Sequence, residues 1–282
     1  MAEHWKGAPV AQALTERLAA RAGQLKVQGI VPTLAIVRVG ERPEDLSYER
    51  GALKRCEKVG IRVRQFALPK ESSHGDLLEV IRQINADREI HGCLLFRPLP
   101  PQMDEEAICA ALDPAKDVDG ITAGSLASVF AGSGAGYPPC TAQACMEILN
   151  YYGCDLTGKR AVVVGRSLVV GKPLAMLLLG QNATVTLCHT RTADLAAECR
   201  RAEVLIAAAG RASMIGRDHL SPGQLVLDVG INVDEEGNLV GDVDFAAADA
   251  IVGAVTPVPG GVGAVTTSVL AAHVLQAAEQ AR

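Results

Sequence analysis

Apolar residues recur along the first half of this chain with two alternating periods. Between residues 8 and 28 they fall at three- and four-residue steps or multiples of these, which predicts an amphipathic helix. Two further segments with helical spacing predict helices over 45–59, ended by Gly60, and over 76–86. Short runs rich in β-branched residues predict strands over 33–39, 61–68 and 92–96. This alternation of strands and helices predicts a parallel sheet covered by helices.

The second half of the chain shows a similar alternation after a different kind of segment. Residues 97–139 are rich in Pro, Gly and charged turns and predict a loop-rich stretch, followed by a helix over 141–151. Strands and helices then alternate, and a hairpin-like turn and a terminal helix follow. The strands are predicted over 161–164, 183–188, 204–208 and 225–229, the helices over 172–179, 194–201 and 262–281, and the turn over 234–238.

A glycine-rich turn separates the first strand of this second block from its first helix. Gly165 permits a sharp turn after the strand, and Gly171 permits close approach of the helix to the strand. Pro173 suits the first helical turn, where its missing N–H costs nothing. Free N–H groups and the helix dipole favour an anion at such a turn, so the pattern predicts a dinucleotide phosphate site. The alternative is that this turn binds no ligand, because its glycine spacing is not GxGxxG and a single glycine turn is a weak signal.

The charges near this turn favour one dinucleotide over the other. An acidic residue that binds a ribose 2′-hydroxyl is expected at the end of the next strand, but the sequence there is CHTRT at 188–192. Arg166 and Arg191 are available instead. Because a basic pair suits a 2′-phosphate, NADP is predicted rather than NAD.

Composition removes several other classes of function. The net charge is −5 with no basic block, and aromatic residues are only 3%, so nucleic-acid binding is not expected. The eight cysteines form no CxxC pair, and no Cys/His cluster has zinc spacing, which predicts reduced thiols and no metal site. No apolar run approaches the roughly 20 residues of a membrane helix, and the N-terminus lacks a signal-peptide core. A cytoplasmic protein without membrane partners is therefore expected.

Five motifs together resemble one enzyme family. They read KDVDG at 116–120, VGRSLVVGKP at 164–173, DVGIN at 228–232, GDV at 241–243 and PVPGGVG at 257–263. With these motifs the chain closely resembles the bifunctional methylenetetrahydrofolate dehydrogenase/methenyltetrahydrofolate cyclohydrolases over its whole length. The resemblance implies oxidation of 5,10-methylenetetrahydrofolate with NADP in one-carbon metabolism. In the full family reaction, the methenyl product is then hydrolysed to 10-formyltetrahydrofolate.

The resemblance also implies a fold, an assembly and roles for particular residues. It implies a homodimer of two-domain α/β chains, with a folate domain over 1–140 plus 262–282, a Rossmann-like NADP domain over 141–261 and a folate cleft between them. Tyr48 would stack on the aminobenzoyl ring of folate, and Asp119 would hydrogen-bond the pteridine. The remaining folate contacts would come from Pro257, Gly260 and Gly261. The NADP site would be lined by Gly165, Arg166, Ser167, Thr190 and Ile231, with Arg191 beside them.

The chain departs from the family where the catalytic lysine stands. The family pattern is Tyr-x-x-x-Lys-x-Lys, and this chain reads YERGALK at 48–54, so the catalytic position is Ala52 and only Lys54 remains. A glutamine partner of that lysine is replaced by Phe96, in LFRPLP at 95–100, with Arg97 beside it. At about 100° per residue, position 52 shares a helix face with Tyr48, whereas position 54 does not.

These departures predict a competent dehydrogenase with weak or absent cyclohydrolase activity. Hydride transfer needs orientation and proximity, whereas hydrolysis needs an acid–base group. Three alternatives stay open. Lys54 could still serve in catalysis, which would make the enzyme bifunctional, or the chain could be a dehydrogenase of another substrate or a folate binder without activity. On the residues alone, Tyr48 could be an ordinary half-buried aromatic, Asp119 a turn-former and Lys54 a solvated lysine.

Overall fold

The computed structural model describes residues 1–281 and divides into two compact units. Unit 1 comprises Met1–Gln12 and Thr141–Thr266, and unit 2 comprises Ala13–Cys140 and the segment from Thr267 onward. The domain boundaries expected from the sequence differ from this division, because residues 1–12 and 262–266 fall in unit 1. The N-terminus joins unit 1 because β1 (Glu3–His4) pairs in parallel with β11 (Ala254–Val255).

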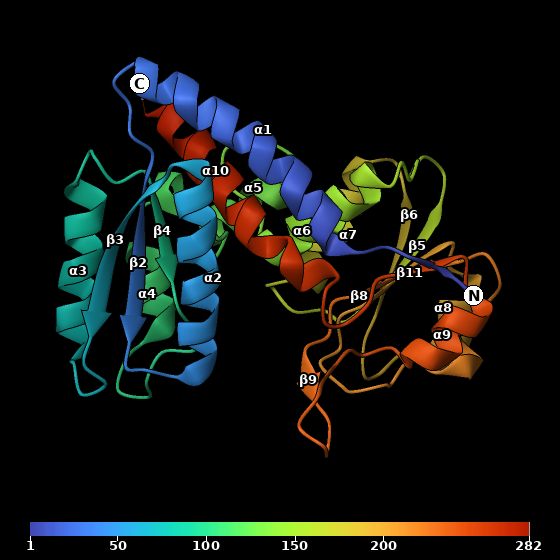
Figure 1. Ribbon diagram of the computed structural model, residues 1–282. Helices are drawn as coiled ribbons and strands as arrows, with labels where there is room; N and C mark the ends of the chain where they lie inside the picture. The colour runs from blue at the N-terminus through green and yellow to red at the C-terminus, as the bar shows by residue number, and fades with distance from the viewer. Residues whose placement is uncertain (282) are drawn as a thin grey trace. The chain divides into compact units, whose positions relative to one another are not determined.

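Unit 2 is built on a three-stranded parallel sheet. Its strands are β2 (Thr33–Val39), β3 (Arg62–Leu68) and β4 (Gly92–Leu95), in the order β3-β2-β4. Helix α3 (His74–Ala86) covers one face and α2 (Pro43–Val59) the other (Figure 1). The central strand β2 is buried at six of its seven positions because it is covered on both faces.

The segment over 97–139 is more regular than a loop-rich stretch, so that prediction is only partly right. It contains α4 (Glu105–Ala111), η1 (Pro114–Lys116) and α5 (Ala123–Ala131). Each begins with a side chain that accepts a hydrogen bond from the backbone two or three residues on, namely Asp104, Asp113 and Thr122. Capping stabilises these pieces although they are too short to show a helical period.

Unit 1 contains a six-stranded sheet in which every pairing is parallel, in the order β1-β11-β8-β7-β5-β6. Helices α7, α8 and α9 connect successive strands, and an antiparallel β9–β10 hairpin follows β8. The predicted strands and the hairpin of this half are present, but α9 and β11 were not anticipated. Their bounds are β5 (Arg160–Val164), α7 (Gly171–Gly180), β6 (Thr184–Cys188), α8 (Leu195–Arg201), β7 (Val204–Ala207), η2 (Arg217–His219), β8 (Leu225–Asp228), β9 (Asn232–Val233), β10 (Leu239–Val240) and α9 (Phe245–Ile251).

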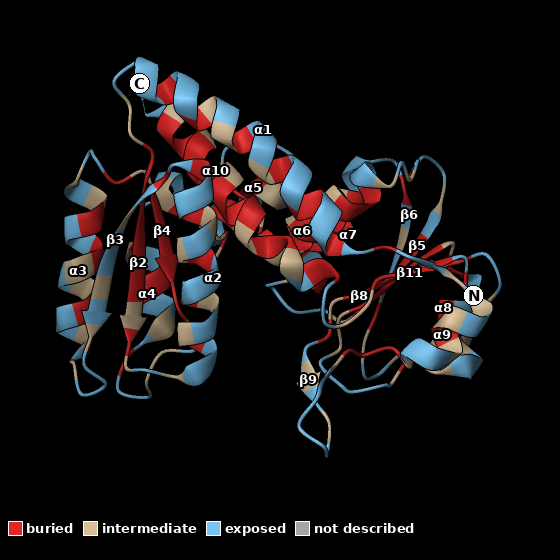
Figure 2. Cartoon of the chain, viewed as in Figure 1, coloured by how far each residue is buried: buried red, intermediate tan, exposed pale blue. Residues whose placement is uncertain are grey.

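Three longer helices and a short 3₁₀ turn complete the chain. They are α1 (Gly7–Val27), α6 (Cys140–Tyr151), η3 (Val262–Ala264) and α10 (Thr266–Gln280). Buried residues are frequent on the central strands of both units and also on α6 and α10 (Figure 2). Within residues 1–281, no helix combines the length and the apolar character that a membrane crossing requires.

Candidate functional site

The glycine turn predicted for a dinucleotide lies where the strand order of unit 1 changes direction. Starting from β5, the next strand along the chain, β6, lies on one side, and the strand after it, β7, lies on the other. Open α/β sheets bind ligands at the carboxyl ends of the strands at such a point. A side chain at Gly165, whose φ is +129°, would place its Cβ 2.0 Å from the carbonyl oxygen of Ala208, and one at Gly171 would place it 1.9 Å from that of Gly165. Only glycine fits at either position.

A cavity of about 470 Å³ opens at this turn. Four of the residues predicted for the NADP site, Gly165, Arg166, Ser167 and Thr190, line it together. The other two predicted residues are not among its lining. Arg191 is exposed next to Thr190, and Ile231, with 70% of its surface exposed, lines a different cavity.

The lining of this cavity is cationic. Arg166 and Arg211 contribute two guanidinium groups, and no Asp or Glu is among the lining residues. Ser167 is used by the turn itself, since its hydroxyl accepts a hydrogen bond of 3.1 Å from the N–H of Val170. The structure therefore adds Arg211, from the loop after β7, as a second basic residue. Sequence spacing had suggested Arg191 for that place.

Two buried aspartates hold the loops around the cavity and account for the DVGIN and GDV motifs. Asp242 accepts hydrogen bonds of 2.6 to 2.9 Å from the N–H groups of Ala209, Gly210 and Arg211, and so fixes the loop that presents Arg211. Asp228 accepts hydrogen bonds from three more backbone N–H groups, at residues 230, 242 and 243. Burial raises the pKa of Asp228 to about 6, and these backbone hydrogen bonds oppose the rise. Both are loop-holding residues that the sequence reasoning did not single out.

The Pro-Gly-Gly loop forms a smaller cavity of about 240 Å³ in unit 1. Pro257, Gly260 and Gly261, the predicted folate contacts of this loop, line it together with Ile231. The start of α1 packs tightly on the loop, because Gly7 donates a 2.8 Å hydrogen bond to the carbonyl of Gly260 and a Cβ at position 7 would lie 2.1 Å from that of Gly261. Gly7 is therefore a support of this loop that was not predicted.

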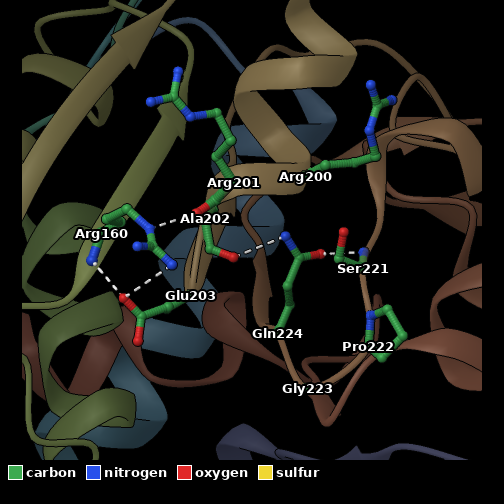
Figure 3. Close-up of a pocket in the computed structure, with 9 residues that line it drawn as sticks. All are labelled: Arg160, Arg200, Arg201, Ala202, Glu203, Ser221, Pro222, Gly223 and Gln224. Atoms are coloured by element: carbon green, nitrogen blue, oxygen red, sulfur yellow. Dashed lines mark hydrogen bonds and ion pairs between the residues drawn. The ribbon is translucent and has the colours of Figure 1, made fainter.

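A third cavity, of about 370 Å³, lies at the amino ends of β5, β7 and β8 and is lined by three arginines (Figure 3). Arg160 donates to the carbonyl of Arg201 and lies 3.7 Å from Glu203, while Arg200 donates to the carbonyl of Asp218. The guanidinium groups in Figure 3 do not converge on a common point. The geometry is that of a structural hollow at the opposite edge of the sheet from the glycine turn.

In unit 2, the ring of Tyr48 packs against the ring of Phe96. The ring centroids of Tyr48 and Phe96 are 5.9 Å apart, with an interplanar angle of 82°, which is an edge-to-face contact. Ala52, four residues after Tyr48 on α2, is completely buried. Lys54 lies on the exposed side of the same helix. The structure thus brings together Tyr48 and Phe96 and leaves Lys54 in solvent.

A charged network lies beside Tyr48 that the sequence reasoning missed. Arg38 Nε lies 3.1 Å from Glu49 Oε2 without the alignment of a hydrogen bond, and Gln65 donates a 2.6 Å hydrogen bond to Glu49 Oε1. The Glu49 side chain is only 6% exposed. One signal was available in the sequence, since Arg38 is the single charge in the apolar strand TLAIVRV.

Asp119 sits in a turn that is held from two sides. The Val118 carbonyl accepts a 2.9 Å hydrogen bond from His273 Nδ1 and a 3.4 Å one from Cys140 Sγ. Burial raises the pKa of Asp119 to about 6, and hydrogen bonds with Cys140 oppose the rise. Burial lowers the pKa of His273 to about 4, so that ring stays neutral near pH 7 and donates from Nδ1.

Arg97, the residue after Phe96, is engaged in an ion pair. Its guanidinium lies 3.4 Å from Glu105 on α4, which also accepts a hydrogen bond from the N–H of Leu99. Among residues 1–281, no group of three or more His, Cys, Asp or Glu side chains is arranged to hold a metal ion.

Comparison with known sequences and structures agrees with this arrangement. Residues 5–119 match the catalytic domain, and residues 139–282 the NAD(P)-binding domain, of tetrahydrofolate dehydrogenase/cyclohydrolase. The chain is 52% identical to the bifunctional protein FolD of Carboxydothermus hydrogenoformans over 281 residues, covering 99% of this chain and 98% of that one. It is 49% identical to FolD of Clostridioides difficile, over 96% and 95% of the two chains.

Solved structures show the same similarity in three dimensions. The bifunctional FolD of Campylobacter jejuni superposes with a TM-score of 0.96 at 35% identity, covering 99% of both chains. The Trypanosoma brucei dehydrogenase-cyclohydrolase, solved with NADP and an inhibitor, superposes with a TM-score of 0.93 at 32% identity, over 99% of this chain and 98% of that one. From the two domain matches, the whole-length identity and the glycine turn at the switch point, this chain belongs to the tetrahydrofolate dehydrogenase/cyclohydrolase family.

Proposed function

We propose that this chain oxidises 5,10-methylenetetrahydrofolate to 5,10-methenyltetrahydrofolate with NADP, and that its cyclohydrolase activity is weak or absent. The second half is supported by the buried methyl group of Ala52, at the position where the resemblance to the family leads us to expect a catalytic lysine. Unit 1 is the nucleotide-binding part under this proposal, and unit 2 contributes Tyr48 and Asp119 to folate binding.

The residues at the glycine turn fit NADP. Gly165 and Gly171 leave no room for a Cβ, so the absence of side chains lets the backbone of the turn come close to a pyrophosphate at the start of α7. Arg166 and Arg211 in the same acid-free cavity suit the additional charge of a 2′-phosphate. When bound, the nicotinamide ring accepts a hydride. The protein supplies binding and orientation.

Loss of the lysine separates the two family reactions because they need different groups. Hydride transfer requires the folate carbon to be held in the right position, which calls for binding residues such as Tyr48 and Asp119. Hydrolysis of the methenyl product requires a group that moves protons. Neither Ala52 nor Phe96 can accept or donate a proton, and loss of a general base typically removes about 10²–10⁴ in rate.

A second candidate function is the full bifunctional reaction. The names of the relatives favour it, since the FolD proteins of Carboxydothermus hydrogenoformans and Clostridioides difficile are both called bifunctional. For this chain it requires a proton-transfer group other than a lysine at position 52. Lys54 is a weak candidate because it lies on the exposed side of α2.

A homodimer is part of the proposal. Its support is a set of exposed apolar side chains around the β9–β10 hairpin: Ile231 is 70% exposed, Val233 65% and Leu239 48%. We expect a dimer by size-exclusion chromatography with light scattering, and a shift towards monomer in Val233→Glu. A wild-type protein that is monomeric at micromolar concentration would remove this part of the proposal.

The proposed function is tested by following both products of one reaction. Purified protein is mixed with 5,10-methylenetetrahydrofolate and NADP, and NADPH and methenyltetrahydrofolate are recorded together beside a mixture without enzyme. We expect NADPH to form while methenyltetrahydrofolate accumulates and decays at the rate of the enzyme-free mixture. Rapid loss of the methenyl product would support the bifunctional alternative, and no NADPH formation would refute the dehydrogenase.

A further inference from the structure

Glu49 joins three secondary-structure elements of unit 2 at one buried point. It lies on the second turn of α2, and each of its carboxylate oxygens has a partner on a different strand. Oε2 is 3.1 Å from Arg38 Nε at the end of β2, and Oε1 accepts a 2.6 Å hydrogen bond from Gln65 of β3. Arg38 also donates a 2.7 Å hydrogen bond to the carbonyl of Gly40. The three side chains therefore tie α2 to β2 and β3.

This tie lies on the same face of the sheet as the Tyr48–Phe96 contact. Ile36 is paired with Gln65 on one side and with Leu94 on the other, so Arg38 and Phe96, each two residues further on, share that face. The N–H of Phe96 donates to the carbonyl of Val37, which continues the register of β4. Tyr48 and Glu49 are consecutive on α2. The rotation of one helical turn therefore sets both the ion pair and the edge-to-face aromatic contact.

Tyr48 is less deeply buried than the charged pair beside it. Its ring is half-buried, whereas the Glu49 side chain is 6% exposed and the Arg38 side chain 16%. Ala52, the next residue on the buried face of α2, offers only a methyl group. The orientation of this turn is therefore set at two consecutive residues, by the edge-to-face contact of Tyr48 with Phe96 and by the buried pairing of Glu49 with Arg38.

We propose that Arg38, Glu49 and Gln65 are positioning residues for folate binding, which hold α2 in the rotation that places the Tyr48 ring against Phe96. This inference rests on the proposed function, because it assigns Tyr48 to the folate. The three residues do not touch the reacting atoms.

The test compares Glu49→Gln, Arg38→Lys and Gln65→Leu with a matched control in the full-length protein. The control is Arg64→Leu, since Arg64 is the neighbour of Gln65 on β3, points to the other side of the strand and pairs with Asp87 instead. The readouts are KM for methylenetetrahydrofolate, KM for NADP, kcat and the melting temperature. Gln65 is exposed, so Gln65→Leu keeps the test informative if a charged variant fails to fold.

We expect Glu49→Gln to raise the folate KM roughly tenfold, with the NADP KM and kcat within about twofold of wild type. Arg38→Lys, which keeps the charge, should retain most of the wild-type folate affinity. Arg64→Leu should change neither KM value nor kcat. A lower melting temperature with an unchanged folate KM, or an equal rise of both KM values, would overturn the inference. Wild-type protein without dehydrogenase activity would instead refute the proposed function.

Discussion

Adding one methyl group at Gly171 should damage the nucleotide site, whereas the same change at the far end of the helix should not. A Cβ at position 171 would lie 1.9 Å from the carbonyl oxygen of Gly165, and real Cβ contacts are essentially never shorter than 3.0 Å. The turn must therefore open by about 1.1 Å in Gly171→Ala. A misplacement of about 1 Å can cost on the order of 10²-fold in rate, which corresponds to about 2.7 kcal/mol of transition-state stabilisation.

The matched control is Gly180→Ala at the other end of the same helix. A Cβ at position 180 would meet nothing within 4 Å, so alanine there should stabilise the protein by roughly 0.5–1 kcal/mol and leave activity unchanged. The assay is the initial rate of NADPH formation over a range of NADP concentrations, with urea unfolding of each variant.

We expect kcat/KM for NADP to fall about 10²-fold in Gly171→Ala and to stay within about twofold of wild type in Gly180→Ala. The reasoning is refuted if folded Gly171→Ala keeps the wild-type kcat/KM for NADP. It is also refuted if both alanine variants lose activity equally, because the loss would then come from the helix as a whole.

Three further predictions concern other parts of the chain. Because burial lowers the pKa of His273 to about 4 from an ordinary value of 6.5, the stability due to its neutral form is lost as the pH falls from about 6.5 to about 4. Between pH 7 and pH 4.5, the free energy of unfolding measured in urea should fall by about 2–3 kcal/mol more in the wild type than in His273→Gln. An equal fall in the wild type and the variant would contradict this prediction. Gly7→Ala should raise the folate KM, because the added methyl group would push on the Pro-Gly-Gly loop. Gly23→Ala is the control, since its Cβ on the same helix would meet nothing within 4 Å and should leave the folate KM unchanged. Equal KM values for the two variants would contradict a supporting role of Gly7. Ala52→Lys alone should not create cyclohydrolase activity, because Glu49 three residues earlier would pair with the new ammonium group and keep it protonated. The prediction is wrong if the variant hydrolyses methenyltetrahydrofolate faster than the enzyme-free mixture does.

The amino-acid sequence by itself determined most of the long elements and the nucleotide turn. The helix over α2 ends at Gly60, which adopts φ +88° as a C-terminal glycine does, and the strand predicted over 33–39 is β2. Gly165 and Gly171 could be recognised because the tight turn they form depends on residues that are close in sequence. The family resemblance added the expectation that Ala52 stands in place of a lysine, and helix periodicity puts position 52 on the face of Tyr48.

Tertiary structure decided the features that depend on residues far apart in the chain. The short helices between 105 and 131 are stabilised by single capping side chains, and their length is too small for a periodic signal. The choice of Arg211 rather than Arg191 as a cavity residue follows from β7 lying beside β5, which no local pattern encodes.

The same reason explains the two polar clusters of unit 2. Glu49 meets Arg38 and Gln65 only because α2 packs across β2 and β3, and His273 reaches the carbonyl of Val118 across 155 positions of sequence. From the sequence alone, a charged side chain in a strand or helix is expected to be exposed to solvent. Its burial and its partner are set by which elements pack together. The sequence, through the family resemblance, therefore suggested a lost lysine at position 52, and only the fold showed that Glu49, next to Tyr48, meets Arg38 and Gln65.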